Sequence, residues 1–223
     1  VAVSRGPGLL GSLLVGTAFA KGLCLGTGAR LLGVNHLMGH LLAAGLSEKL
    51  EFPALGLLVS GGHTNIYYFA SAVKSLQLGR TIDDAAGEAF DKTGKILGLA
   101  YPGGRLLDTL ARRGRADAKL FPRPYLDNDN LDFSFSGLKT AVSLYVKEHF
   151  ADEPWPHLLQ NPDDAPQGLC DLCASFNLAV VDTLLAKVRR AMKRYPGVRK
   201  LIMAGGVAAH KRLSESGTGI MVG

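Results

Sequence analysis

Short apolar runs alternate with longer helical patterns along the chain, and this alternation is the feature that most constrains the fold. We expect strands near residues 1–4, 31–35, 54–60, 64–70 and 199–204. Helices are expected near residues 8–27, 36–48, 83–99, 103–113, 137–150 and 165–195. Strands that alternate with helices are typical of the α/β class. The sequence therefore predicts an α/β architecture.

The segment 151–164, ADEPWPHLLQNPDD, interrupts this pattern with three prolines. We interpret it as a linker between residues 1–150, an α/β region that carries the candidate sites, and residues 165–223, the start of a second lobe. The chain begins without Met inside a predicted strand and ends in SGTGIMVG, soon after another strand and helix begin. We expect a fragment that is incomplete at both termini.

Charge and composition favour a globular protein with a polyanionic partner. The chain has 25 Lys and Arg against 19 Asp and Glu, which gives a formal charge of +6. The apolar run from Leu9 to Leu25 is interrupted by Lys21 and is shorter than the roughly 20 residues of a membrane span, so we predict a buried helix. Three cysteines without a disulfide framework or signal peptide indicate the reducing cytoplasm, and Cys170 and Cys173 are interpreted as core thiols.

The stretch VNHLMGHLL places His36 and His40 four residues apart in an apolar context. On a helix, residues four apart share one face, so the two rings could bind one metal ion. The alternative is a pair of core histidines. A zinc protease of the H-E-x-x-H type needs a Glu directly after the first His, and Leu37 stands there instead.

A second candidate site follows the apolar strand Leu55–Val59. This strand leads into Ser60-Gly61-Gly62, and the backbone of such a turn can approach a ligand or bind phosphate through its N–H groups. An ordinary hairpin turn is the alternative. The stretch RGPGLLG at 5–11 is a similar Gly-rich turn at the start of a helix. It either binds an anion at the helix N-terminus or is an ordinary turn.

Carboxylates gather on the helix predicted over 83–99. Asp84, Glu88 and Asp91 fall on one edge of the helical wheel, opposite the apolar face. They form either a solvated face or an acidic edge of a binding site, and Asp108 lies one turn inside the following helix.

Basic residues gather near the end of the predicted helix 165–195. Lys187, Arg190 and Arg194 share one face, which is either solvated or a candidate contact for a phosphate backbone. Elsewhere, Ser136 is the expected N-cap of the helix that follows it.

Several long motifs, in order along the chain, together resemble the TsaD/Kae family, and its bacterial members most closely. They are VNHLMGH, LLVSGGHT, IDDAAGEAFDKTGKILGLAYPGG, FPRP, DFSFSGLKT and MAGGVAA. The resemblance implies the two-lobed actin-like ATPase fold of the acetate and sugar kinase superfamily. It also implies transfer of a threonylcarbamoyl group from threonylcarbamoyl adenylate to the exocyclic amine of the adenosine next to the anticodon, in tRNAs reading codons that begin with A.

The resemblance also assigns site residues. His36 and His40 match metal ligands for iron(II) or zinc, and the family's third ligand is an Asp in a C-terminal segment that this sequence lacks. The residues that match substrate contacts are Leu58, Val59, Ser60, Gly61, Gly62, Asp91, Gly104 and Asp108. At a further substrate contact the family usually has Asn, and this chain has His210.

The expected ligands and partners come from the resemblance as well. They are one divalent metal ion, threonylcarbamoyl adenylate, a possible ATP, tRNA, a paralogous TsaB-like subunit and a TsaE-like small ATPase, with no membrane partner. Two alternatives remain open: a truncated family member without catalysis, and a metalloendopeptidase as in the family's older label.

Overall fold

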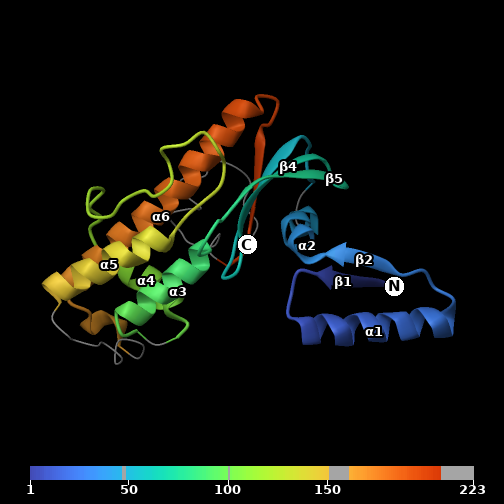
Figure 1. Ribbon diagram of the computed structural model, residues 1–223, viewed down its shortest axis with the longest axis horizontal. Helices are drawn as coiled ribbons and strands as arrows, with labels where there is room; N and C mark the ends of the chain where they lie inside the picture. The colour runs from blue at the N-terminus through green and yellow to red at the C-terminus, as the bar shows by residue number, and fades with distance from the viewer. Residues whose placement is uncertain (47–48, 100, 151–160, 207–223) are drawn as a thin grey trace. The chain divides into compact units, whose positions relative to one another are not determined.

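The computed structural model describes residues 1–46, 49–99, 101–150 and 161–206 (Figure 1). Residue contacts divide the chain into a first unit, Val1–Leu50, and a second unit that begins at Glu51. Each unit combines strands with helices, so the predicted α/β class is confirmed.

The first unit is a β-α-β segment followed by a short helix. Its elements are β1 (Ala2–Gly6), α1 (Leu10–Thr27), β2 (Leu32–Asn35), α2 (His36–Leu42) and the 3-10 turn η1 (Ala43–Leu46). β1 and β2 pair in parallel, as the long helical connection between them requires. Gly28 caps the C-terminus of α1: its φ of 71° suits glycine, and its N–H donates to the Cys24 carbonyl over 2.9 Å.

The predicted helix near 8–27 is present, but the prediction that it is buried was wrong. Among the residues of α1 only Ala20 is buried, and Val15 and Phe19 are 73% and 70% exposed. The helix packs on β1, and a two-stranded sheet covers only one narrow stripe of it. By length and composition both α1 and α6 (Gln167–Arg194) could cross a membrane, and 6% and 78% of their apolar windows are buried.

The second unit contains a four-stranded sheet in the order β5-β4-β3-β6. Its strands are β3 (Ala54–Val59), β4 (Thr64–Ser71), β5 (Lys74–Arg80) and β6 (Lys200–Ala204). β3 and β4 form an antiparallel hairpin, and β6 pairs with β3 in parallel. The sequence analysis missed β5 because it is an edge strand whose residues are mostly exposed, so it lacks a strong apolar pattern.

The second unit's other elements are α3 (Ala86–Ile96), α4 (Gly103–Ala111), α5 (Ser136–His149), the 3-10 turn η3 (Pro162–Asp164) and α6. α3 packs against α4 and α5, and α4 packs against α6 (Figure 1). α6 carries much of the core, including Cys170 and Cys173, which are free thiols at 1% and 0% exposure. The interpretation of these cysteines as core thiols is confirmed, and burial raises the pKa of both.

Most of the predicted linker 151–164 lies outside the described residues, which resume at Asn161. Beyond it, α6 and β6 pack with β3 and α4 in the second unit. The structure therefore places a boundary after Leu50, where the sequence analysis expected none. The division into regions 1–150 and 165–223 stays a prediction.

Candidate functional site

The predicted Gly-rich turn closes the β3–β4 hairpin. The Ser60 N–H donates to the His63 carbonyl over 2.8 Å, and the His63 N–H donates to Ser60 Oγ over 3.1 Å. Gly61 and Gly62 are exposed between them, and a Cβ added at either would meet nothing within 4 Å. The turn is thus held at its ends by Ser60 and presents open backbone at its tip.

α3 begins directly on this turn. The Ala86 N–H donates to the buried Thr64 hydroxyl over 2.8 Å, and the Gly87 N–H donates to the Ser60 carbonyl over 3.2 Å. A Cβ at Gly87 would lie 2.7 Å from the Ser60 carbonyl oxygen and 2.8 Å from the Gly61 backbone. The absence of a side chain at Gly87 therefore lets the helix N-terminus touch the turn.

A cavity of about 660 Å³ opens beside the turn and α3, and we call it the α3 cavity. Its lining residues are Gly61, Glu88, Asp91, Lys92, Lys95, Leu99, Tyr101 and Gly103. It thus combines open backbone with two carboxylates, two ammonium groups and one aromatic ring. Such a mixture can bind a polar ligand that carries both an apolar ring and an anionic group.

Asp91 links the α3 cavity to the start of α4. Its Oδ1 accepts a hydrogen bond from the Gly104 N–H over 3.2 Å, which satisfies one of the free donors at that helix end. Gly94 and Gly103 allow α3 and α4 to approach, because a Cβ at Gly94 would lie 2.8 Å from Gly103 Cα. The structure thus brings together Gly61, Asp91 and Gly104 of the predicted substrate contacts.

The acidic edge of α3 is partly neutralised by Lys92. Its Nζ lies 2.5 Å from Asp84 Oδ1 and 2.9 Å from Glu88 Oε1, and these hydrogen bonds raise the pKa of Lys92. Glu88 and Asp91 line the cavity, whereas Asp84 is not among its lining residues. Two of the three carboxylates therefore face a potential ligand site.

Other predicted contacts lie apart from the α3 cavity. Leu58 and Val59 are fully buried in β3, which pairs with β4 on one side and with β6 on the other, so neither residue is exposed to a ligand. Asp108 is buried, with its Oδ2 2.8 Å from Arg112 Nη2 and its Oδ1 3.2 Å from Asn177 Nδ2, and it does not line the cavity. His210 lies outside the described residues.

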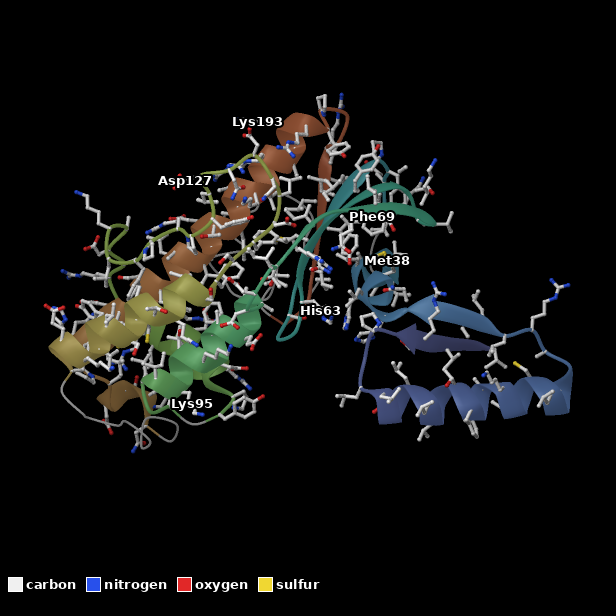
Figure 2. All side chains as sticks on the ribbon, in the orientation of Figure 1. Met38, His63, Phe69, Lys95, Asp127 and Lys193 are labelled. Atoms are coloured by element: carbon white, nitrogen blue, oxygen red, sulfur yellow. The ribbon has the colours of Figure 1, made fainter. Side chains whose placement is uncertain are left out.

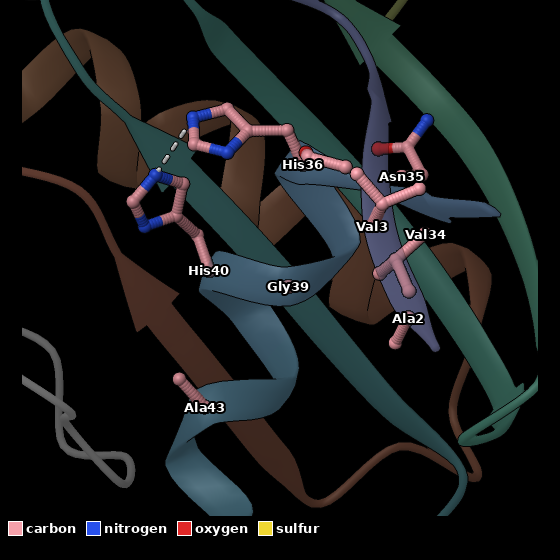
Figure 3. A pocket seen from close by; sticks show the side chains of 9 residues that line it. Ala2, Val3, Val34, Asn35, His36, Gly39, His40 and Ala43 are labelled. Carbon is pink, nitrogen blue, oxygen red and sulfur yellow. Dashed lines mark hydrogen bonds between the residues drawn. The ribbon is translucent and has the colours of Figure 1, made fainter. Parts of the chain in front are cut away.

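The two histidines of the first unit face one another (Figure 3). They are residues of α2, which Asn35 caps by accepting hydrogen bonds from the Leu37 and Met38 N–H groups. The Nε2 atoms of His36 and His40 lie 3.2 Å apart, and both side chains are exposed. They line a cavity of about 310 Å³ together with residues of β1, β2 and η1.

This geometry fits a shared metal ion. Two nitrogens that each bind a tetrahedral zinc ion at about 2.0–2.1 Å lie roughly 3.3 Å from each other. The 3.2 Å separation matches this distance. Among the described residues no group of three or more His, Cys, Asp or Glu side chains could hold a metal, so only two protein ligands are in place there.

The candidate phosphate contact on α6 was wrong for Lys187 and Arg190. Lys187 is fully buried, and its Nζ donates to Asn128 Oδ1 over 2.9 Å and to the Asn130 carbonyl over 3.0 Å. Arg190 donates to backbone carbonyls of the same loop, 125–130, and Arg194 bonds the Asp129 carbonyl. Figure 2 labels Asp127 on this loop and Lys193 on α6. These cations hold a loop in place.

Sequence reasoning missed Asp83 as a structural residue. Its carboxylate accepts hydrogen bonds from the Phe135 N–H over 2.9 Å and from the Ser134 and Ser136 hydroxyls over 2.6 and 2.7 Å. α5 begins at Ser136, so the expected N-cap at Ser136 was one residue late. Burial alone would raise the pKa of Asp83, but these hydrogen bonds outweigh it and lower the pKa.

A model of the TsaD family, described as tRNA N6-adenosine threonylcarbamoyltransferase, matches residues 1–221. Proteins with that description include one from Desulfovibrio desulfuricans, 66% identical over 99% of this chain and 61% of its own length. Another, from Streptococcus pneumoniae, is 50% identical over 96% of this chain and 60% of its own length. The chain thus spans about three fifths of the length of these relatives.

A solved structure shares the fold. It is the (R)-2-hydroxyglutaryl-CoA dehydratase component A of Acidaminococcus fermentans, with a TM-score of 0.50, 14% identity, and coverage of 98% of this chain and 79% of that one. At this identity the likeness concerns the fold alone. The predicted actin-like α/β architecture is confirmed.

Proposed function

We propose, since this chain belongs to the TsaD family, that its protein transfers a threonylcarbamoyl group from threonylcarbamoyl adenylate to tRNA. The acceptor is the exocyclic amine of the adenosine next to the anticodon, in tRNAs reading codons that begin with A. The observation that carries this proposal is the α3 cavity, where the open Ser60–His63 turn, Asp91 and Gly103 meet beside the N-terminus of α3.

The cavity suits an adenylate. The exposed Gly61 and Gly62 let a phosphate approach their backbone, and the N-terminal end of α3 adds a partial positive charge. Tyr101, which is 85% exposed, can stack on an adenine ring, and the Asp91 carboxylate can accept a hydrogen bond from a ligand hydroxyl. Ser60 would contribute backbone atoms, and the Gly104 N–H orients Asp91. For Leu58 and Val59 a substrate contact is proposed on the family resemblance alone.

The reaction needs an amine, an activated carbonyl and a leaving group. The adenosine amine forms a C–N bond to the carbamoyl carbon, the bond from that carbon to the phosphate oxygen breaks, and AMP leaves while the amine loses a proton. Groups that hold the adenylate phosphate stabilise the departing negative charge. In this chain those groups are the turn backbone and the lysines beside it.

We propose that His36 and His40 hold iron(II) or zinc, with further ligands from outside the described residues. A bound metal of this kind supplies Lewis acidity and a template for the substrate. For Asp108 and His210 a substrate contact is proposed on the family resemblance alone, and ATP is a further candidate ligand. A TsaB-like subunit, a TsaE-like ATPase and a cytoplasmic location complete the proposal.

In the part of the chain that the structure describes, no observation favours the peptidase alternative. Leu37, which stands where a protease base would follow His36, is buried at 7% exposure. The description of the matching family is that of a transferase.

The test is a transfer assay with the protein that contains this chain and its partner proteins. Purified adenylate labelled in the threonine carbon is mixed with tRNA, and acid-precipitable label is counted over time. We expect label in tRNA and a large decrease for Asp91→Asn, because its carboxylate lines the cavity. Release of label only as free threonine, with none in tRNA, would contradict the proposal.

A further inference from the structure

A second cavity lies between α3 and α5, and we call it the α3–α5 groove. It has a volume of about 590 Å³ and is lined by Lys92, Lys95, Ile96, Lys139, Thr140 and Ser143. α3 and α5 pack against each other, and Lys95 is labelled on α3 in Figure 2. Residues at spacings of three and four share one helix face, so each helix presents its lining side chains together.

The chemistry of the groove is that of an anion site. Its lining has three ammonium groups and two hydroxyls, and it has no carboxylate. Lys92 is paired with Asp84 and Glu88, but within the described ranges the ammonium groups of Lys95 and Lys139 have no hydrogen-bond or ion-pair partner. Two positive charges therefore remain uncompensated there, which raises the local concentration of anions.

The groove also adjoins the proposed reaction site. Lys92 and Lys95 line both the groove and the α3 cavity. A phosphate held between Lys95 and Lys139 would therefore lie next to a ligand bound in the α3 cavity. The lining offers only Ile96 as an apolar surface and no aromatic ring for a base, so it suits a sugar-phosphate backbone better than a whole nucleotide.

We propose that the α3–α5 groove binds a backbone phosphate of the tRNA beside the acceptor adenosine. Lys95 and Lys139 supply the charge, and the Thr140 and Ser143 hydroxyls are available as donors. This inference rests on the proposed function, because it assigns a contact to the proposed substrate. It also replaces the α6 surface as the expected phosphate contact.

The test compares two pairs of charge reversals in the complete protein with its partners. The first is Lys95→Glu with Lys139→Glu, and the matched control is Arg189→Glu with Lys193→Glu, two exposed cations on α6. The dissociation constant for labelled tRNA is measured by filter binding between 50 and 200 mM salt. Each neutralised phosphate contributes about 0.7–0.9 to the slope of log affinity against log salt concentration, so the one proposed phosphate contact changes affinity by about threefold over this range.

We expect the Lys95→Glu, Lys139→Glu variant to bind tRNA more weakly and to lose about threefold of the salt dependence, while the control variant keeps the parent slope. An unchanged slope in the groove pair, or an equal loss in both pairs, would overturn the proposal. Lys139→Arg should keep the parent affinity, and thermal melting of every variant checks that the fold is intact.

Two further measurements distinguish an RNA phosphate from a mononucleotide phosphate, and the groove proposal from the proposed function. AMP binding should be unchanged in Lys139→Glu, since Lys139 does not line the α3 cavity. A large loss of AMP affinity would instead assign the groove to a mononucleotide and overturn the RNA contact. Normal tRNA binding that depends on the groove, without any threonylcarbamoyl transfer, would contradict the proposed function and leave the groove assignment standing.

Discussion

The close contact between α3 and the Ser60–His63 turn makes Gly87→Ala the sharpest structural perturbation of the α3 cavity. The new Cβ would lie 2.7 Å from the Ser60 carbonyl oxygen and 2.8 Å from Gly61 N and Cα, all backbone atoms that cannot rotate away. α3 or the turn must therefore move. That movement would also stretch the 3.2 Å hydrogen bond from the Gly87 N–H to Ser60.

The expected loss of stability in Gly87→Ala has three contributions. Overpacking costs about 1–3 kcal/mol and loss of the hydrogen bond about 0.5–1.5 kcal/mol, while alanine gains at most about 1 kcal/mol in helix propensity. The variant should therefore be less stable by about 0.5–4.5 kcal/mol. For a chain of this size, this corresponds to a decrease in Tm of about 1–18 °C.

Gly137→Ala is the matched control because Gly137 is also the second residue of its helix. A Cβ there would meet only Pro124 Cβ, at 4.0 Å, so the variant should keep or slightly raise the Tm. Thermal unfolding, monitored by circular dichroism, gives the Tm of both variants. The affinity for AMP reports whether the shape of the α3 cavity has changed. A Gly87→Ala protein that melts as high as Gly137→Ala and binds AMP like the parent would refute the close-contact argument.

Three further outcomes are expected. His36→Ala or His40→Ala should lower metal affinity by more than about tenfold, measured by mass spectrometry of the purified protein, whereas His149→Ala should not, because only the first two are paired at 3.2 Å. Lys187→Met should destabilise the protein by about 1–3 kcal/mol because it leaves loop oxygens unpaired. Burial, and then repulsion from Arg190, lowers the pKa of Lys187 from 10.5 to about 8. Between these two pH values the unfolded chain holds the proton more tightly than the folded protein, so the stability of the parent should rise with pH while that of Lys187→Met should not, as urea unfolding measures. Asp83→Ala should lower the stability at pH 7 by about 0.5–2 kcal/mol. Because the pKa of Asp83 is lowered in the folded protein, the difference in stability between parent and variant should vanish as pH falls through that lowered pKa. Equal stability of the two proteins at pH 7 would contradict the capping role.

Sequence periodicity located most helices and strands because their apolar residues recur at the spacing of one face. It missed β5, whose residues are mostly exposed, and it located α1 but not its exposure. Spacing can predict that a helix has apolar residues, but its burial depends on which elements pack against it.

Local spacing also located the histidine pair and three residues of the α3 cavity, Gly61, Glu88 and Asp91, but not the cavity's two lysines or Tyr101. It could not reveal that Lys187 contacts a loop some 60 residues away, or that Asp83 caps a helix that begins 53 residues later. Such contacts depend on tertiary packing, so a basic or acidic residue looks like a surface charge until its partner is placed. The same reason hid the α3–α5 groove, whose lysines come from two helices.

The most direct test of the central claim is to locate the modified nucleoside. tRNA that reads a codon beginning with A is treated with the protein, its partners and threonylcarbamoyl adenylate, then digested with a sequence-specific ribonuclease and analysed by mass spectrometry. We predict the mass of one threonylcarbamoyl group on the adenosine next to the anticodon, and none on a tRNA that reads codons beginning with another base. An unmodified adenosine at that position, or the added mass elsewhere in the tRNA, would contradict the account.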